Sequence, residues 1–502
     1  MAFTKPSPGS GALQRPPVSP NDNLKISTSM KNIGWALLLI LANLFPAQAQ
    51  LSVYDLNTPF GWAVCTSLTS GDDYRLTGGG NGSSITLTSN GGDMKEALYD
   101  AIQRYDIVVL DGSAGDFSIS SSLSLKGLRN KTIVGINGAR LCSAFSVTEE
   151  IKAALDSVGV KNMSGSDGGG TLVNGATVKE EGEYYTRKTL IELLGDEKES
   201  YRKSGIFTLN LCENLIIRNL AFVGPGSVDV GGYDLISVTG STHLWVDHCS
   251  FTDGMDGNMD ITQRADFVTV SWCTFAYTSR SYAHAFSNLI AGSDDPSQGE
   301  YNLNVTWANC WWQTGCQNRM PMARFGVVHL INNFYDCPGA SRCINPRKES
   351  DFRIEGNYFA PGVTRIFSQT DATACVWKDN LFSETFTPED FGSVLIPYTY
   401  PLYEASEVEA VVSNPRNGAG PTLEEPLDMT RHTSHIGESS AGPAMRQAGL
   451  SVIAPNATTP LSLYTTDGRL LHSAMGKINL FSYPTGIYII SNGRYHLKII
   501  RP

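Results

Sequence analysis

Residues 243–251 read HLWVDHCSF, a strand-like alternation of apolar and polar side chains that ends on an aromatic residue. The pattern recurs between residues 214 and 382, with starts 22 to 37 residues apart, as NLIIRNLAF (214–222), FVTVSWCTF (267–275), NVTWANCWW (304–312), GVVHLINNF (326–334), DFRIEGNYF (351–359) and ACVWKDNLF (374–382). Periods of 20–50 residues indicate a solenoid. One β-run per period, with no helical stretch between, predicts an all-β protein built as a single-stranded parallel β-helix.

Stacking of the coils places equivalent positions about 4.8 Å apart. The closing aromatic residues should then form one ladder: Phe222, Phe251, Phe275, Trp312, Phe334, Phe359 and Phe382. The seventh position reads Leu220, Cys249, Cys273, Cys310, Asn332, Asn357 and Asn380. We expect the three cysteines to be buried free thiols, because stacked positions on parallel coils rarely have bridging geometry. The asparagines should bond backbone amides at the turns.

Composition and charge limit the class of protein. The chain has 502 residues, of which 49 are glycine and 17% are charged, which suits a turn-rich all-β protein with one large core and a small extra domain. A net charge of −11 argues against a nucleic-acid partner. It does not exclude an anionic substrate, because a local basic cluster or a bound cation reverses the sign at a site.

The N-terminal part carries a targeting signal. Residues 30–50, MKNIGWALLLILANLFPAQAQ, combine a basic start, an apolar run too short to span a membrane, and the small residues Ala47 and Ala49. This predicts a secretory signal cleaved after Ala49. Residues 1–49 are therefore assigned as leader and signal peptide, with Met30 as a candidate true start. In an exported protein the ten cysteines invite disulfides, although sequence does not give their pairing.

The rest of the chain divides into three parts. We assign residues 50–422 to the β-helix, 423–447 to a linker and 448–502 to a small C-terminal β domain. Residues 147–160 and 183–203 have helical periodicity and should pack outside the stack or cap one end.

Three aspartates crowd the stretch FTDGMDGNMDITQR (251–264). The EF-hand pattern fails here, and in an extended strand Asp256 and Asp260 would lie roughly 13 Å apart, too far to share one cation. A bend at Gly257-Asn258 would bring them together, with Asp234 one coil below as a third carboxylate. Asp253 reads as a turn residue, and a solvated acidic turn is the alternative for the whole stretch.

The motifs WVDHC (245–249), DGNMDI (256–261), FVTVSW (267–272) and RMPMAR (319–324) follow one another on these coils. As an ordered set they resemble the pectate lyase family, polysaccharide lyase family 1, over roughly residues 60–420. The resemblance implies a right-handed β-helix with outer loops and helices, and calcium-assisted cleavage of polygalacturonate. It also implies roles for particular residues: Asp234, Asp256 and Asp260 as ligands of Ca²⁺, Arg319 as the catalytic base, and Arg280 and Arg324 as substrate-binding residues.

Two positions depart from the family pattern. Gly232 stands where the family often has another acid, so coordination of calcium would lean on water or substrate. Arg280 stands where a lysine is usual, which keeps the charge but replaces a point donor with a planar fork. Asp247 and His248 lie in mid-strand and are expected to be a buried, structural hydrogen-bonded pair. His284 is expected to be a surface or subsite residue, and Trp311 a candidate for stacking on sugar.

In the implied reaction, β-elimination removes the C5 proton beside a carboxylate and expels the C4 oxygen, giving a 4,5-unsaturated product. Calcium and cationic side chains stabilise the charge that develops. Arginine is normally protonated, so Arg319 acts as a base only if neighbouring cations disfavour its charged form. The alternative is that Arg319 is solely an electrostatic clamp.

Rival functions remain open. A glycoside hydrolase would place close carboxylates around a water and would not need the RMPMAR arginines. A pectin lyase would lack the calcium aspartates, and a non-catalytic glycan-binding β-helix would use the same fold without chemistry.

The C-terminal segments LSLYTTDGRLL (461–471) and INLFSYPTGIYIISNGRYHLKIIRP (478–502) resemble the β-sandwich sorting domain of proteins exported by type IX secretion. The resemblance implies a secreted or cell-surface protein that contacts outer-membrane secretion machinery. The alternative is a small accessory β domain. We expect the protein to be monomeric.

Overall fold

The structure is a computed structural model and describes residues 56–146, 170–171, 177–178, 204–427 and 446–501. Short gaps fall at 70, 72, 228–231, 282–283, 300–301 and several positions between 449 and 495. The predicted signal peptide and the predicted helices at 147–160 and 183–203 lie outside the described residues. No described helix is long and apolar enough to cross a membrane.

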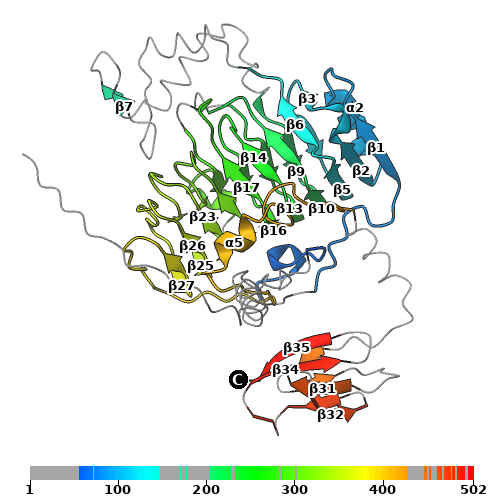
Figure 1. Ribbon diagram of the computed structural model, residues 1–502. Coiled ribbons are helices and arrows are strands. Elements are labelled where there is room, and N and C mark those ends of the chain that lie inside the picture. Colours follow the sequence, from blue (N-terminus) through cyan, green and yellow to red (C-terminus); the bar gives the residue numbers. More distant parts are fainter. Residues whose placement is uncertain are drawn as a thin grey trace, which may run out of the picture. The chain divides into compact units, whose positions relative to one another are not determined.

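Three parallel sheets form the main body (Figure 1). Sheet A has ten strands: β1 (Ser84–Thr88), β2 (Ile107–Asp111), β5 (Arg129–Ile136), β10 (Glu213–Arg218), β13 (Thr242–Asp247), β16 (Asp266–Ser271), β19 (Val305–Ala308), β22 (Val327–Ile331), β25 (Asp351–Glu355) and β27 (Ala374–Lys378). Sheet B has nine: β3 (Phe117–Ile119), β6 (Arg140–Ser143), β11 (Ala221–Val223), β14 (Ser250–Thr252), β17 (Thr274–Ala276), β20 (Trp311–Trp312), β23 (Phe334–Tyr335), β26 (Tyr358–Phe359) and β28 (Leu381–Phe382). Sheet C has seven: β4 (Leu123–Lys126), β9 (Phe207–Asn210), β12 (Ile236–Thr239), β15 (Met259–Thr262), β18 (Asn288–Ile290), β21 (Met322–Ala323) and β24 (Asn345–Pro346).

Each coil contributes one strand to each sheet in turn, as β13, β14 and β15 do. The parallel β-helix predicted from the repeat is therefore confirmed. Two short helices of the described part of the chain lie outside the sheets. The helix α2 (Lys95–Arg104) buries Leu98, Ala101 and Ile102 in the same core as the sheets, and α5 (Val408–Val412) packs near β23. The 3₁₀ turns are η1 (Gly61–Val64), η2 (Gly112–Ala114) and η4 (Pro296–Gln298).

The aromatic ladder forms inside the helix, with one position different from that predicted. Its rungs are Phe222, Phe251, Phe275, Trp312, Tyr335, Phe359 and Phe382, with successive ring centroids 4.4 to 5.6 Å apart. The prediction of Phe334 was wrong, because Phe334 pairs with Trp311 in the neighbouring column. That stack also gives Trp311 a protein partner, with ring centroids 5.6 Å apart.

The same one-residue correction applies to the asparagines. Asn333, rather than Asn332, continues the column, and its backbone N–H donates to Asn357 Oδ1 at 2.8 Å. Asn357 N–H in turn donates to Asn380 Oδ1 at 2.9 Å. Below them, Cys249, Cys273 and Cys310 are fully buried thiols, as expected. The side chains of this column therefore satisfy backbone groups from inside the coils.

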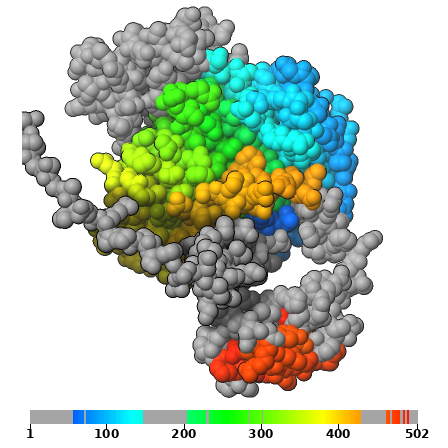
Figure 2. All heavy atoms as spheres, viewed as in Figure 1, coloured from blue at the N-terminus to red at the C-terminus, as the bar shows by residue number. Residues whose placement is uncertain are grey.

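A band formed by residues 403–423 runs back across the coils, as Figure 2 shows in orange. Tyr403 N–H donates to Asn332 Oδ1, and Leu423 N–H donates to Asn219 Oδ1. Both asparagines occupy one column of turns with left-handed backbone, at φ 51° and 57°. His248 lies in the same column, at φ 47°.

Asp247 and His248 are fully buried at the end of β13 in sheet A. Asp247 Oδ2 lies 2.7 Å from His248 Nδ1 and 3.1 Å from Arg218 Nε, and Ser271 Oγ donates to Oδ1 at 2.7 Å. Asp247 and His248 therefore belong to a buried network on sheet A, whereas the predicted calcium ligand Asp260 lies on sheet C.

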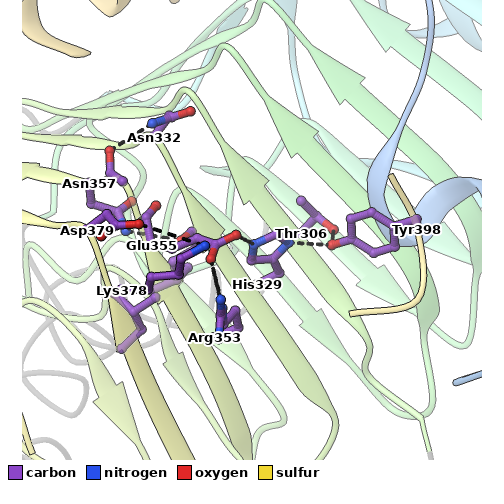
Figure 3. A network of polar contacts seen from close by, with 12 residues as sticks. Thr306, His329, Asn332, Arg353, Glu355, Asn357, Lys378, Asp379 and Tyr398 are labelled. Carbon is purple, nitrogen blue, oxygen red and sulfur yellow. Dashed lines mark hydrogen bonds and ion pairs between the residues drawn. The ribbon is translucent and has the colours of Figure 1, made fainter. Parts of the chain in front are cut away.

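A second network covers the outer face of sheet A (Figure 3). Glu355 is fully buried and accepts two hydrogen bonds from Arg353, from Nε at 2.9 Å and Nη2 at 2.6 Å. His329 Nε2 lies 3.4 Å from Glu355 Oε1, and His329 Nδ1 lies 2.7 Å from the hydroxyl of Tyr398. Tyr398 Oη also meets Thr306 Oγ1 at 2.7 Å, so this network ties the segment around residue 398 to three coils.

The C-terminal strands form two antiparallel sheets. One contains β29 (Arg446–Ala448), β30 (Ser451–Ile453) and β33 (Lys477–Asn479). The other contains β31 (Leu461–Thr465), β32 (Leu470–Ala474), β34 (Gly486–Ser491) and β35 (His496–Arg501). Leu461, Leu463, Ile478, Leu480, Tyr488 and Ile490 form their core. Strand β29 begins inside the segment assigned as linker. A short pair, β7 (Gly170–Thr171) and β8 (Thr177–Val178), completes the described strands.

Candidate active site

The predicted aspartates meet on the outer face of sheet C. Along β12 and β15 alternate residues are buried, so Ile236, Met259 and Ile261 face the core. The intervening Ser237 and Asp260 face outward and are partners in the parallel register. Asp234 lies just before β12, one coil earlier than Asp256 and Asp260.

Asp234 and Asp260 both border the backbone at Gly257. A Cβ atom at position 257 would lie 2.8 Å from Asp234 Oδ1 and 3.1 Å from Asp260 Oδ1, so only glycine leaves both carboxylates room. Asp234 Oδ2 accepts a hydrogen bond from Ser237 Oγ at 2.7 Å, whereas the buried Oδ1 has no hydrogen-bond partner among the described residues. Asp260 Oδ1 accepts from Leu289 N–H at 3.0 Å. An orphaned buried carboxylate oxygen is the kind of group that a cation satisfies.

The electrostatics of this pair are unfavourable in the protein alone. Burial, reinforced by the charge of Asp256, raises the pKa of Asp234 from 3.8 to about 7. Burial and the charge of Asp234 raise the pKa of Asp260 well above its ordinary value. The guanidinium of Arg319 opposes both shifts. Close carboxylates out of water need a cation to ionise together.

Asp256 contributes to this field from a different position. The chain bends at Met255-Asp256 and Asn258, close to the predicted Gly257-Asn258, and Asn258 Oδ1 accepts from Gly254 N–H at 3.1 Å. Asp256 is 36% exposed, and its Oδ1 lies 3.2 Å from Nε2 of His284. His284 is only 7% exposed, so its expected place at the surface was wrong. The contact could not be predicted from the repeat, because His284 lies in the irregular loop between β17 and β18.

The carboxylates of Asp234, Asp256 and Asp260 do not converge on one position where a cation could bind all three. Within the described parts of the chain, no three histidine, cysteine, aspartate or glutamate groups converge as a metal site. The predicted ligand set is therefore brought together only in part. Asp234 and Asp260 fit calcium in the kind and direction of their oxygens, and Asp256 faces His284. A calcium ion bound by this pair would take its other ligands from water or substrate.

Arg319 lies one coil beyond the loop that carries His284 and Phe286. A parallel bridge joins Phe286 to Asn318, and Arg319 O accepts from Asn288 N–H at 2.7 Å. Arg319 has left-handed backbone, at φ 59°, and its guanidinium lies over the Phe286 ring, 5.0 Å from the centroid. The cation is therefore near the aspartates on the same edge of sheet C.

Arg324 lies at the other end of β21. Its side chain is 11% exposed, with Nε 2.5 Å from Asp294 Oδ1 and Nη1 2.9 Å from Ala291 O. Burial lowers the pKa of Arg324. The register of β18 and β21 places Ala291, and not Asp294, opposite Arg324, so the ion pair depends on the path of the chain after β18. A substrate carboxylate at Arg324 would compete with Asp294.

Arg280 is held by Asp253. Asp253 is fully buried and accepts from Arg280 Nε at 3.1 Å and Nη2 at 2.7 Å. It also accepts from Thr278 N–H, Thr278 Oγ1 and Ser281 Oγ at 2.7 to 2.8 Å. The interpretation of Asp253 as a plain turn residue was therefore incomplete. The side chain of Arg280 is 49% exposed. Asp253 holds its guanidinium group in a fixed orientation, which a lysine ammonium would not have.

The sequence of this chain is similar to those of known pectate lyases. The family model described as pectate lyase matches residues 175–399. A pectate trisaccharide-lyase from Thermotoga maritima is 27% identical over 310 residues, which are 60% of this chain and 63% of that protein. A probable pectate lyase A from Aspergillus niger is 30% identical over 259 residues, 50% of this chain and 76% of that one.

A solved structure with a similar fold is the pectate lyase of Bacillus sp. N165 in complex with trigalacturonate. It has a TM-score of 0.48 and 17% identity, and the match covers 73% of this chain and 99% of that one. The chain thus spans 63% of the length of the Thermotoga relative and three quarters of the Aspergillus one. The match to the Aspergillus protein, together with the family model, shows that the chain belongs to the pectate lyase family.

Proposed function

We propose that this protein is a pectate lyase that cleaves α-1,4-linked polygalacturonate by calcium-assisted β-elimination to 4,5-unsaturated oligogalacturonates. The observation that carries the proposal is the pair of carboxylates that border Gly257, the buried Asp234 and the half-buried Asp260, within the electrostatic field of the Arg319 guanidinium. Burial raises the pKa of both acids, and the charge of Arg319 offsets the rise only in part, which is expected of a site built to receive a cation.

Asp234 and Asp260 would hold calcium, with Asp256 at the edge of the same site. When bound, the ion neutralises the galacturonate carboxylate and stabilises the charge that develops beside it. Arg319 would lie against the reacting sugar and take the C5 proton. The alternative role for Arg319 is that of a fixed positive charge facing the enolate-like transition state.

Arg280 and Arg324 would bind further substrate carboxylates. Each is already held by one acidic residue, Asp253 or Asp294, which orients the guanidinium and leaves donors for a ligand.

The test is to follow ultraviolet absorbance of the unsaturated product on polygalacturonate and on highly methylated pectin, with calcium and with a chelator. Calcium-dependent absorbance on polygalacturonate supports the proposal. Absorbance on methylated pectin that survives the chelator would indicate a pectin lyase. New reducing ends without absorbance would indicate a hydrolase, and binding without either would indicate a non-catalytic pectin-binding protein.

We also propose that the protein is exported and carries a C-terminal sorting domain. Support comes from the signal-like stretch at 30–50 and from the antiparallel strands β31, β34 and β35 in the segment that resembles such domains. Fractionation of a cell with a type IX system would test this. Full-length protein should reach the medium or cell surface, and a chain ending at residue 447 should remain in the periplasm.

A further inference from the structure

Cys337 and Cys343 face each other in the coil that follows Arg319. Their sulfur atoms are 3.8 Å apart, and both residues are fully buried. The thiols of the column at 249, 273 and 310 are different, because each donates to a carbonyl two residues earlier in its own coil: Asp247 O, Ser271 O and Ala308 O.

The local sequence builds this approach. Cys337-Pro338-Gly339-Ala340 forms a turn in which Ala340 N–H donates to Cys337 O at 3.1 Å. Gly339 has φ 77°, a conformation that a Pro-Gly turn requires of its third residue. Ser341 then anchors the returning chain, because its backbone N–H and its Oγ both donate to Gln317 O. The chain therefore brings Cys343 back against Cys337.

The pair also lies against the candidate active site. Met320 N–H donates to Cys343 O at 2.9 Å, so the Cys343 segment is the next rung of the ladder beyond Arg319-Met320. Tyr335, two residues before Cys337, donates its hydroxyl to Met320 O at 3.0 Å. Both cysteines thus belong to the layer that supports the Arg319 turn.

We propose that Cys337 and Cys343 form a disulfide in the mature protein, closing the loop CPGASRC (337–343) behind Arg319. The oxidant is a disulfide, either a small molecule such as oxidised glutathione or a protein disulfide. One thiolate attacks the oxidant and forms a mixed disulfide, and the second thiolate displaces the oxidant sulfur. The oxidant gains two electrons and two protons as two thiols, while one S–S bond of about 2.05 Å replaces two S–H bonds.

The bond should form while the chain folds. Contact with Cys337, together with burial, raises the pKa of Cys343 well above its ordinary value, so little thiolate exists once the coil is closed. For the same reason the bond, once made, is protected from exchange.

Cys316 is the competing partner, because it is buried next to this pair and adds to the electrostatic field at Cys343. Its own thiol donates to Phe275 O at 3.3 Å, away from the turn at 337–340. The geometry therefore favours the pairing of Cys337 with Cys343.

Peptide mapping tests the assignment on the wild-type full chain. The protein is folded with oxidised glutathione, free thiols are blocked with N-ethylmaleimide in denaturant, and the product is digested with trypsin. Cleavage after Arg324, Arg342 and Arg347 separates residues 325–342, with Cys337, from residues 343–347, with Cys343. We expect these two peptides to remain linked, lighter than their sum by the two lost hydrogens, and to separate on reduction.

The peptide 265–280, with Cys273, is the matched control and should be fully alkylated. Separate alkylated peptides 325–342 and 343–347 would overturn the proposal. So would a link from either of them to peptide 281–319, which contains Cys310 and Cys316. Neither result depends on enzymatic activity.

A stability measurement gives a second readout. The wild type folded with oxidised glutathione should melt about 3 °C above the variant carrying Cys337→Ser and Cys343→Ser, because a short closed loop constrains the unfolded chain. The difference should be smaller when both proteins are folded with a reductant, and what remains is the cost of burying two hydroxyls in place of two thiols. An equal difference under oxidant and reductant would mean that packing of the thiols, and not a bond, stabilises this coil.

Discussion

Glu355 on sheet A differs in its surroundings from Asp234 and Asp260 at sheet C: Glu355 and Asp234 are buried and Asp260 is half-buried. Glu355 receives two hydrogen bonds from Arg353 and faces His329 under the segment around Tyr398. Burial alone would raise its pKa, yet contacts with His329, Tyr400 and Arg353 hold it at about 2. For Asp234 and Asp260 the charge of Arg319 offsets burial and mutual repulsion only in part, and their pKa values rise.

The contrast separates structural from functional charge. A carboxylate that the protein itself neutralises stabilises the native state, and its network is closed. A carboxylate whose pKa is raised costs stability when ionised, and the cost is removed by a ligand. Sheet A is therefore expected to respond to mutation through stability and sheet C through activity and calcium.

The largest expected effect is on sheet C, from Arg319→Ala. Loss of the cation or base should lower kcat on polygalacturonate by about 1,000-fold, with little change in melting temperature. The measurement is initial rate by ultraviolet absorbance. Arg319→Lys separates the two roles: a base should shift the pH profile, whereas a clamp should keep the profile and much of the rate. An active alanine variant would exclude both.

Asp260→Asn should lower activity by about 100-fold, because it removes a hard anionic ligand from the proposed calcium site. Titration of the rate with calcium should show a weaker apparent affinity for calcium. Excess calcium should restore part of the activity. Asp266→Asn is a control on the neighbouring sheet, since Asp266 is bonded within the protein by Asn304. Equal loss in both variants would mean that the effect at Asp260 is structural.

Glu355→Gln tests the closed network. It should destabilise the fold by about 3 kcal/mol, because Arg353 loses its buried partner, while specific activity of the folded protein is kept. Glu349→Gln, which breaks the exposed pair with Lys348, should change stability by less than about 0.5 kcal/mol. Because the pKa of Glu355 is lowered, its ionised side chain stabilises the fold at pH values above the ordinary glutamate pKa. This stabilisation is lost as the pH falls through about 2.

Asp253→Asn should lower activity by about tenfold, because Arg280 loses the acid that fixes its fork. The expected change is in KM for polygalacturonate more than in kcat. Arg280→Lys in the Asp253→Asn background should add little, since the orientation is already lost. An additive effect would show that Arg280 acts without Asp253.

The smallest effect is thermal. Because the pKa of Asp234 is raised to about 7, the protonated side chain favours the folded state. This contribution is fully present below about pH 4 and is lost as the pH rises through about 7. A bound cation favours the ionised form, so calcium should raise the melting temperature by a few degrees more at about pH 8 than at about pH 5. Asp234→Asn should abolish the difference, and an equal shift at both pH values would contradict the assignment.

Sequence predicted the repeat, the parallel coils and most of the columns, because alternation and period are local properties. It misplaced one rung, since Asn332-Asn333 and Phe334-Tyr335 offer the same residue types in two registers. The partners of Asp253, Asp256 and Arg324 could not be predicted in the same way. They lie across loops of different length, so their approach depends on the conformation of each loop and not on the period.

The band at 403–423 has a consequence for the order of folding. Its hydrogen bonds to Asn332 and Asn219 join the end of the β-helix to coils formed up to about two hundred residues earlier. During synthesis, which starts at the N-terminus, those coils can stack before residues 403–423 have been made. Their turns are then exposed to solvent. Closure then comes last and at long sequence separation, which slows the final step. A truncation before residue 403 should therefore give coils that assemble but are vulnerable to proteolysis along that edge.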